Sequence, residues 1–210
     1  MPDLYIPADK INGAENGDKA VVRLTAWEKS KRVPEGEVVE VVKQEAMNDL
    51  AMKQILLQAG FSLSFQDEVM EQAERFPDGV TESEAKKRRD FRDVLTFTID
   101  PVDAKDFDDA LSIKKNANGL YEIGVHIADV SYYVEPDTAL DKEAYQRATS
   151  VYLPDRVNPM LPEKISNELC SLRPNEDKFT FSAIFQINDE AHVKQYWLGR
   201  TVIHSDKRYA

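Results

Sequence analysis

The chain has 210 residues, of which 42% are hydrophobic and 9% are aromatic, and its formal net charge is −11 at pH 7. This length and composition predict one or two domains with a substantial hydrophobic core. No segment reaches the ~20 consecutive apolar residues that a membrane span needs, and no apolar secretory segment follows Met1, so we expect a cytoplasmic protein without a membrane partner. The single Cys170 excludes an internal disulfide and a cysteine-cluster zinc site, and its apolar neighbours predict a buried thiol without chemistry.

Residues 1–46 are predicted to form a small, partial OB-like β module. Short β-branched or alternating runs lie at 4–6, 19–24 and 37–42, with turns rich in Asn, Gly and Pro between them. A complete OB barrel needs about five strands, and only three are indicated here. We therefore expect an open sheet edge that either pairs with another chain or is disordered.

Residues 47–92 change to a helical period and are predicted to form a connector. One helix is indicated up to Gly60, a second at about 65–75, and a third that opens with the capping-box sequence at 81–84 and runs through the following basic residues. Nothing in this segment demands chemistry.

Two basic runs interrupt the acidic chain, at 29–32 and 86–89. A solvated helix or loop face explains each run about as well as nucleic acid does. The acidic net charge by itself does not indicate an RNA partner, which normally requires a basic surface.

Residues 93–210 are predicted to be rich in strands with one or two helices, so that the chain as a whole belongs to the α+β class. The predicted elements are a strand at 96–99, a hairpin of strands 110–113 and 121–128 around the turn 116–119, a helix at 140–148, and strands at 179–187 and 196–203.

The strongest chemical signal lies at residues 100–109, where the sequence DPVDAKDFDD places five aspartates against a single Lys105. Carboxylates this close repel one another unless a hard divalent cation that prefers oxygen ligands lies among them, which predicts Mg²⁺ or Mn²⁺. An EF-hand is excluded, because twelve residues counted from Asp106 end at Ala117 instead of Glu. A solvated acidic loop is the alternative, but the interleaved Phe107 and Ala110 indicate a loop held against a core.

Two further polar residues belong to the second strand of the predicted hairpin, 121–128, and its end. His126 stands between β-branched residues and is interpreted as a hydrogen-bonded core residue rather than a metal ligand, since the predicted metal prefers oxygen. Asp129 ends the strand, where it either orients the site or caps a turn.

Four ordered motifs carry a family resemblance. DFRDVLTFTIDPVDAKDFDDALS is followed by YEIGVHIADVSYYV, ATSVYLPDRVNPMLPEKISNELCSLRP and GRTVIHSDKR. Together they resemble the RNB family of processive 3′-to-5′ exoribonucleases, and within it the ribonuclease R group. The resemblance covers about residues 90–209, and the first 42 residues resemble the cold-shock module that precedes the catalytic domain in that group.

The resemblance implies that residues 93–210 are the N-terminal portion of a mixed α+β RNB catalytic domain, and that the chain is a fragment of a longer enzyme. It implies metal binding by Asp100, Asp106, Asp108 and Asp109, with Asp108 closest to the catalytic step. The implied substrate is RNA, single-stranded or structured with a 3′ overhang, and no preference for DNA is expected. The implied products are nucleoside 5′-monophosphates.

Three more residues are candidates for RNA contact. Tyr152 lies in a segment stiffened by two prolines; core packing is the usual interpretation of such a tyrosine, and the resemblance implies that it holds the RNA 3′ end. Arg156 and Arg173 could each contact phosphate or pair with a surface carboxylate.

Two other functional classes stay open from the sequence. One is a non-catalytic RNA-binding or structural relative that keeps the fold, although a pure binder has no need to concentrate like charges. The other is a metal-binding scaffold that never meets RNA.

Overall fold

The computed structural model describes residues 3–26, 33–42, 47–102, 104, 106–154 and 156–210. The chain divides into two compact units, Met1–Leu63 and Ser64–Ala210. Among the residues that the structure describes, no helix has both the length and the apolar character needed to cross a bilayer.

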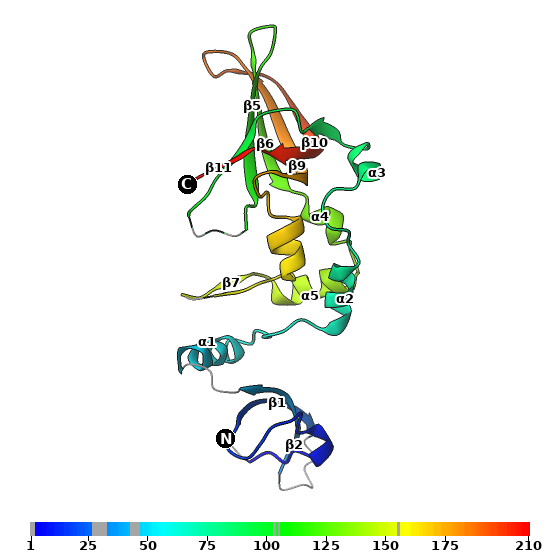
Figure 1. Cartoon of the computed structure of the whole chain (residues 1–210), viewed down its shortest axis with the longest axis vertical. Coiled ribbons are helices and arrows are strands. Elements are labelled where there is room, and N and C mark those ends of the chain that lie inside the picture. The colour runs from blue at the N-terminus through cyan, green and yellow to red at the C-terminus, as the bar shows by residue number, and fades with distance from the viewer. Residues whose placement is uncertain (1–2, 27–32, 43–46, 103, 105, 155) are drawn as a thin grey trace. The chain divides into compact units, whose positions relative to one another are not determined.

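The first unit contains a two-stranded antiparallel sheet (Figure 1). Its elements are the 3-10 helix η1 (Ala8–Lys10), strands β1 (Lys19–Ala26) and β2 (Glu35–Val42), and helix α1 (Met47–Gln58). Both longer predicted strands are confirmed. The strand predicted at 4–6 is wrong, because Tyr5 makes only an isolated bridge to Glu35. Pro7, which has no N–H to donate, then leads directly into η1 and ends the pairing.

Helix α1 ends at the predicted place. The N–H of Phe61 donates to the carbonyl of Leu56 at 2.9 Å, and the N–H of Gly60 donates to that of Leu57 at 3.1 Å. Gly60 has φ +85°, the left-handed conformation that this pair of terminal hydrogen bonds requires.

The second unit is built on a seven-stranded mixed sheet with the strand order β11-β4-β5-β6-β9-β10-β3 (Figure 1). Strands β3 and β11 pair in parallel with β10 and β4, and the other neighbours are antiparallel. The strands are β3 (Arg89–Phe91), β4 (Thr96–Ile99), β5 (Asp109–Lys115), β6 (Tyr121–Ala128), β9 (Glu176–Ile187), β10 (Val193–Ser205) and β11 (Lys207–Tyr209).

The hairpin of β5 and β6 is confirmed, with a register that runs from Asp109 opposite Ile127 to Lys115 opposite Tyr121. Gly119 in its turn has φ +84°, which a side chain would strain. Side chains alternate along β6, so that one face of the sheet is buried and carries polar as well as apolar groups.

Helices gather at one end of this sheet (Figure 1). They are α2 (Asp67–Glu74), α4 (Val130–Tyr133), α5 (Ala139–Arg147) and the π-helix η2 (Lys164–Leu169), and beside them lies the short hairpin of β7 (Val151–Tyr152) and β8 (Val157–Asn158). Helix α3 (Glu82–Ala85) lies at the side of the sheet and leads into β3. Leu140, Ile165 and Leu172 are fully buried in the core that these elements share with the sheet. The predicted helices at 65–75 and 140–148 are confirmed, and the α+β class with them.

The third predicted helix is largely wrong. Helix α3 spans a single turn and ends at Ala85, and the chain enters strand β3 at Arg89. The Thr81 side chain makes no capping hydrogen bond, so the capping box does not form. The helix stops because Arg88 turns inward to a buried carboxylate instead of extending along a solvated face.

Candidate active site

The antiparallel pair β4 and β5 places the aspartate-rich segment at one end of the sheet. Asp100 directly follows β4, Asp106 and Asp108 lie in the connecting loop, and Asp109 is the first residue of β5. Asp103 and Lys105 lie outside the described residues. The two strands therefore bring both ends of the acidic segment close together.

Three hydrogen bonds fix the middle of this loop. The N–H of Phe107 donates to Ser171 Oγ at 3.1 Å, and the carbonyl of Phe107 accepts from the N–H of Leu172 at 2.8 Å. The carbonyl of Asp108 accepts from the N–H of Ala128 at 2.9 Å. Because Phe107 is also buried, the expectation of a loop held against the core is confirmed.

The carboxylates of the loop influence one another. The pKa of Asp108 lies above the ordinary value for aspartate, first because protein atoms displace water from the carboxyl group and then because Asp106, Asp109 and Asp100 add negative charge. Part of the Asp108 side chain still reaches solvent. It therefore combines access from outside with a stronger affinity for a proton than an ordinary aspartate has.

The loop offers oxygen ligands of the kind that Mg²⁺ and Mn²⁺ prefer. Asp100 Oδ2 is buried and has no hydrogen-bond partner among the described residues, which leaves a charged acceptor in need of a cation. Across the residues that the structure describes, no three or more His, Cys, Asp or Glu side chains lie together closely enough to hold a metal ion. The donor chemistry thus fits a divalent ion, whose binding would require these carboxylates to converge.

Tyr152 lies beside the acidic loop. It is on β7, opposite Val157 on β8, and its side chain is 66% exposed, so it is not a core residue. Its hydroxyl donates to Asp106 Oδ2 at 2.8 Å, and this bond is the main reason that the Tyr152 pKa is raised. The hairpin therefore joins two predicted site residues that are 46 positions apart in the sequence.

The two candidate arginines differ in their surroundings. The carbonyl of Arg156 accepts from the N–H of Leu153 at 2.8 Å, in the connection between β7 and β8. Arg173 Nε lies 3.4 Å from Glu176 Oε1, which is a partly exposed ion pair with a neighbouring carboxylate. Phosphate contact by either residue stays a prediction.

His126 and Cys170 are confirmed as core residues. His126 Nδ1 is 2.7 Å from Ser182 Oγ and its Nε2 is 2.8 Å from Ser112 Oγ. Burial lowers the pKa of His126 to about 4 and raises the pKa of the Cys170 thiol to about 12. Both groups are therefore neutral at pH 7.

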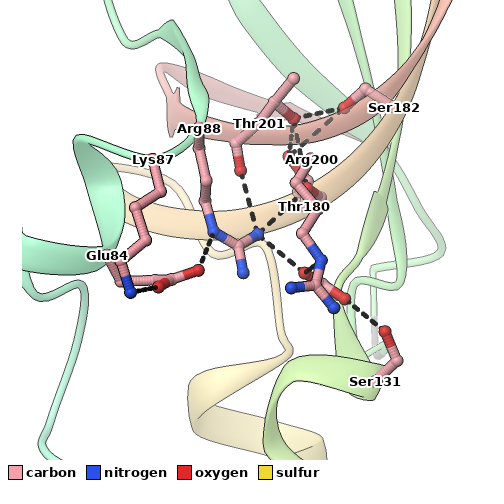
Figure 2. Close-up of polar contacts among 9 residues, drawn as sticks. Glu84, Lys87, Arg88, Ser131, Thr180, Ser182, Arg200 and Thr201 are labelled. Carbon is pink, nitrogen blue, oxygen red and sulfur yellow. Dashed lines mark hydrogen bonds and ion pairs between the residues drawn. The ribbon is translucent and has the colours of Figure 1, made fainter.

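A buried polar cluster around Arg88 was not anticipated from the sequence (Figure 2). Its guanidinium, on a fully buried side chain, donates from Nη1 to Asp129 Oδ2 at 2.7 Å and from Nε to Glu84 Oε1 at 3.1 Å. Asp129 Oδ1 also accepts from Ser131 Oγ at 2.7 Å, and Asp129 makes no side-chain cap on α4. Because Asp129 directly follows Ala128, which binds the Asp108 carbonyl, the cluster stabilises the strand end that supports the acidic loop.

The sequence also missed Arg208 on β11, whose side chain donates to the carbonyl of Pro101 within the acidic loop. No local pattern identifies this arginine, because more than 100 positions separate it from its partner. Arg88 had a weak signal, namely a basic residue four positions after Glu84, the spacing of an ion pair on a helix.

Comparisons with known proteins match both units. The family described as RNB domain matches residues 88–210, and the family described as cold shock domain matches residues 1–66. Ribonuclease R of Aquifex aeolicus is 41% identical over 194 residues, which cover 92% of this chain and 28% of that protein. DIS3-like exonuclease 2 of Xenopus tropicalis is 42% identical over 187 residues, which cover 88% and 22%.

Solved structures give the same result. Mycoplasma genitalium RNase R in complex with ribose methylated single-stranded RNA matches with a TM-score of 0.74 and 27% identity, over 98% of this chain and 32% of that one. The chain therefore spans less than a third of the length of each of these relatives.

Proposed function

Because the chain belongs to the RNB domain family, as its four sequence motifs indicated, we propose that the protein in which it acts is a 3′-to-5′ exoribonuclease. The observation that carries this proposal is the acidic loop with the Tyr152 hydroxyl bonded to Asp106, inside the matched segment. The proposed substrate is RNA with a single-stranded 3′ end, and the proposed products are nucleoside 5′-monophosphates. Stacking and backbone contacts carry no base code, so degradation should be largely independent of sequence.

The proposed cofactor is Mg²⁺, with Mn²⁺ as a substitute, held by Asp100, Asp106 and Asp109. When bound, such an ion would neutralise phosphate charge, activate water and stabilise the leaving oxygen. The buried, unpaired Oδ2 of Asp100 supports this assignment. Asp108 is proposed to lie closest to the chemical step, because its exposed side chain lies between the proposed metal ligands Asp106 and Asp109 and can reach a substrate from outside.

Two further proposals concern the setting of the protein. A single, buried cysteine is consistent with action in the reducing cytoplasm.

Strand β1 pairs with β2 on one side only among the described residues, which supports pairing of this sheet edge with another chain. Sedimentation of the protein at several concentrations tests that association.

The function is tested with 5′-labelled and 3′-labelled single-stranded RNA, incubated with the full-length protein that contains this chain in Mg²⁺ or in EDTA. We expect the 3′ label to be released at once as mononucleotide in Mg²⁺, the 5′ label to remain on progressively shorter RNA, and both to be stable in EDTA. A DNA oligonucleotide of the same sequence is the substrate control. Internal cuts, hydrolysis of DNA at the same rate, or unchanged degradation in EDTA would each contradict the proposal.

Replacing Tyr152 with Ala should weaken retention of the RNA 3′ end and change the length of the final product. Loss of one stacking side chain costs about 1–3 kcal/mol of binding free energy per base. The product ladder is read by denaturing electrophoresis, and 3′-end retention by competition with unlabelled RNA.

Two variants control this prediction. Tyr152→Phe keeps the ring and removes only the hydroxyl that binds Asp106, so its product ladder should match that of the wild type. Tyr145→Ala removes an exposed tyrosine from α5 and should change nothing. If Tyr152→Ala also leaves the ladder unchanged, the residue does not hold the 3′ end.

A further inference from the structure

Strand β11 lies beside β4, the strand that Asp100 directly follows, and is fixed at both of its ends. The N–H of Thr96 donates to Asp206 Oδ2 at 2.8 Å, and the N–H of Asp206 donates to the carbonyl of Thr96 at 2.8 Å. At the other end, the N–H of Asp100 donates to the carbonyl of Tyr209 at 3.0 Å. The middle residue of this three-residue strand therefore has a defined position next to the acidic loop.

That middle residue is Arg208, and its guanidinium contacts the start and the middle of the loop. Nη2 donates to the carbonyl of Pro101, the residue directly after Asp100. The guanidinium carbon lies 4.8 Å from the ring centroid of Phe107, the residue between Asp106 and Asp108. Arg208 Nε is buried and has no hydrogen-bond partner among the described residues.

The shape of a guanidinium suits this double contact. The edge of a guanidinium presents N–H donors in one plane, while its flat face can lie over an aromatic ring. The ammonium group of a lysine cannot make both contacts at once. One side chain from β11 thus ties the start of the loop to its middle.

We propose that Arg208 is a positioning residue that holds Pro101 and Phe107 in fixed places, so that the neighbouring carboxylates of Asp100, Asp106 and Asp108 can converge on one divalent cation. It acts through Pro101 and Phe107 and is not itself a ligand. The inference rests on the proposed metal-dependent function. It goes beyond that function by assigning the geometry of the acidic loop to a residue more than 100 positions later.

The competing role for Arg208 is a simple countercharge, and the two roles predict opposite signs. Removal of a positive charge beside a cation site should strengthen cation binding, because one repulsion is lost. Loss of a residue that shapes the site should weaken cation binding, typically by 10- to 100-fold for a group that orients metal ligands. Cation affinity in the absence of RNA therefore distinguishes the two roles without any measurement of catalysis.

The experiment is a titration of the full chain with Mn²⁺, with the free ion measured by electron paramagnetic resonance at fixed ionic strength. We expect Arg208→Gln to bind Mn²⁺ at least about tenfold more weakly than the wild type. Arg208→Lys keeps the charge but not the double contact, and should also bind more weakly. The matched control is Lys207→Gln, which removes the same charge from an exposed neighbour on the same strand and should bind as the wild type does or slightly more tightly.

The outcomes separate the two levels of the proposal. If the wild type binds no Mn²⁺, the metal step of the proposed function fails, and the role of Arg208 fails with it. If the wild type binds and Arg208→Gln binds equally well or more tightly, only the positioning role is overturned. Should Arg208→Gln fail to fold in thermal unfolding, Arg208→Lys decides: wild-type affinity in that variant overturns the role, and weaker binding with an intact unfolding transition supports it.

Discussion

Replacing Asp108 with Asn should lower single-turnover RNA cleavage by about 10²- to 10⁴-fold, the range expected when a proton-accepting group is removed from a reaction centre. The substitution keeps the size of the side chain and deletes one negative charge. RNA affinity should change little at a fixed salt concentration, because phosphate and stacking contacts elsewhere supply most of it. Cleavage is measured by rapid quench with enzyme in excess, and affinity by filter binding in Ca²⁺ or EDTA.

Stability should respond to the same substitution in the opposite direction. The pKa of Asp108 is raised in the folded state, so its protonated form favours folding below the ordinary aspartate pKa, and this contribution disappears as the pH rises through the raised value. At pH 7 in EDTA the charged carboxylate therefore opposes folding, and the Asn variant should melt at a higher temperature than the wild type. The difference should shrink as the pH falls through the raised pKa.

Asp189→Asn is the matched control, since it removes the same charge from an exposed turn between β9 and β10. It should change neither cleavage nor the melting temperature. Cleavage by Asp108→Asn near the wild-type rate would show that Asp108 takes no part in the chemistry. A joint fall of cleavage, affinity and melting temperature would show that its role is structural.

Replacing Arg88 with Met should lower the free energy of unfolding by about 3 kcal/mol, because it removes the only fully buried cation from Asp129 and Glu84 among the described residues. The remaining partners, Arg200 for Asp129 and Lys87 for Glu84, are at least half exposed and compensate the buried charge only in part. Asp129 and Arg88 have side chains that are 1% and 0% exposed, and Glu84 is nearly as well buried. Methionine fills much of the same volume, so that lost charge pairing and not a cavity causes the effect. Urea unfolding followed by circular dichroism gives the free energy.

An exposed ion pair supplies the control for this prediction. Arg75 lies 3.7 Å from Glu71, and their side chains are 77% and 69% exposed, so Arg75→Met should cost at most about 1 kcal/mol. A double substitution of Arg88 to Met and Asp129 to Asn should recover part of the stability that Arg88→Met loses. Equal losses for the two single arginine variants would mean that the buried pair contributes no more than a surface pair.

The sequence predicted those elements whose own side chains determine them. The β5–β6 hairpin follows from alternating residues on both sides of a turn that ends in Gly119, and α1 ends where Gly60 adopts a left-handed conformation. Strands β3 and β11 could not be predicted, because each has three residues and pairs with a segment about 100 positions away. Local propensity carries little information at that length.

The same distinction holds for the candidate site. The aspartates were identified because like charges packed into one short segment need a physical explanation, and Tyr152 was identified through the family motif. Arg88 and Arg208 were missed because Asp129 and Pro101, with which they pair, lie 41 and 107 positions away in the sequence. A basic residue that lies beside its carboxylate only after folding cannot be distinguished in the sequence from a solvated one.

Cys170 determines which labelling chemistry this protein permits. It is the sole cysteine of the chain, it is buried, and its thiol pKa of about 12 leaves almost no thiolate at neutral pH. Maleimide reagents therefore have no reactive native target in this chain. A cysteine introduced at Asn118, in the exposed turn at the end of β5 opposite the acidic loop, would be the single labelled position, so a dye or spin label placed there can report distances to bound RNA without a cysteine-free background.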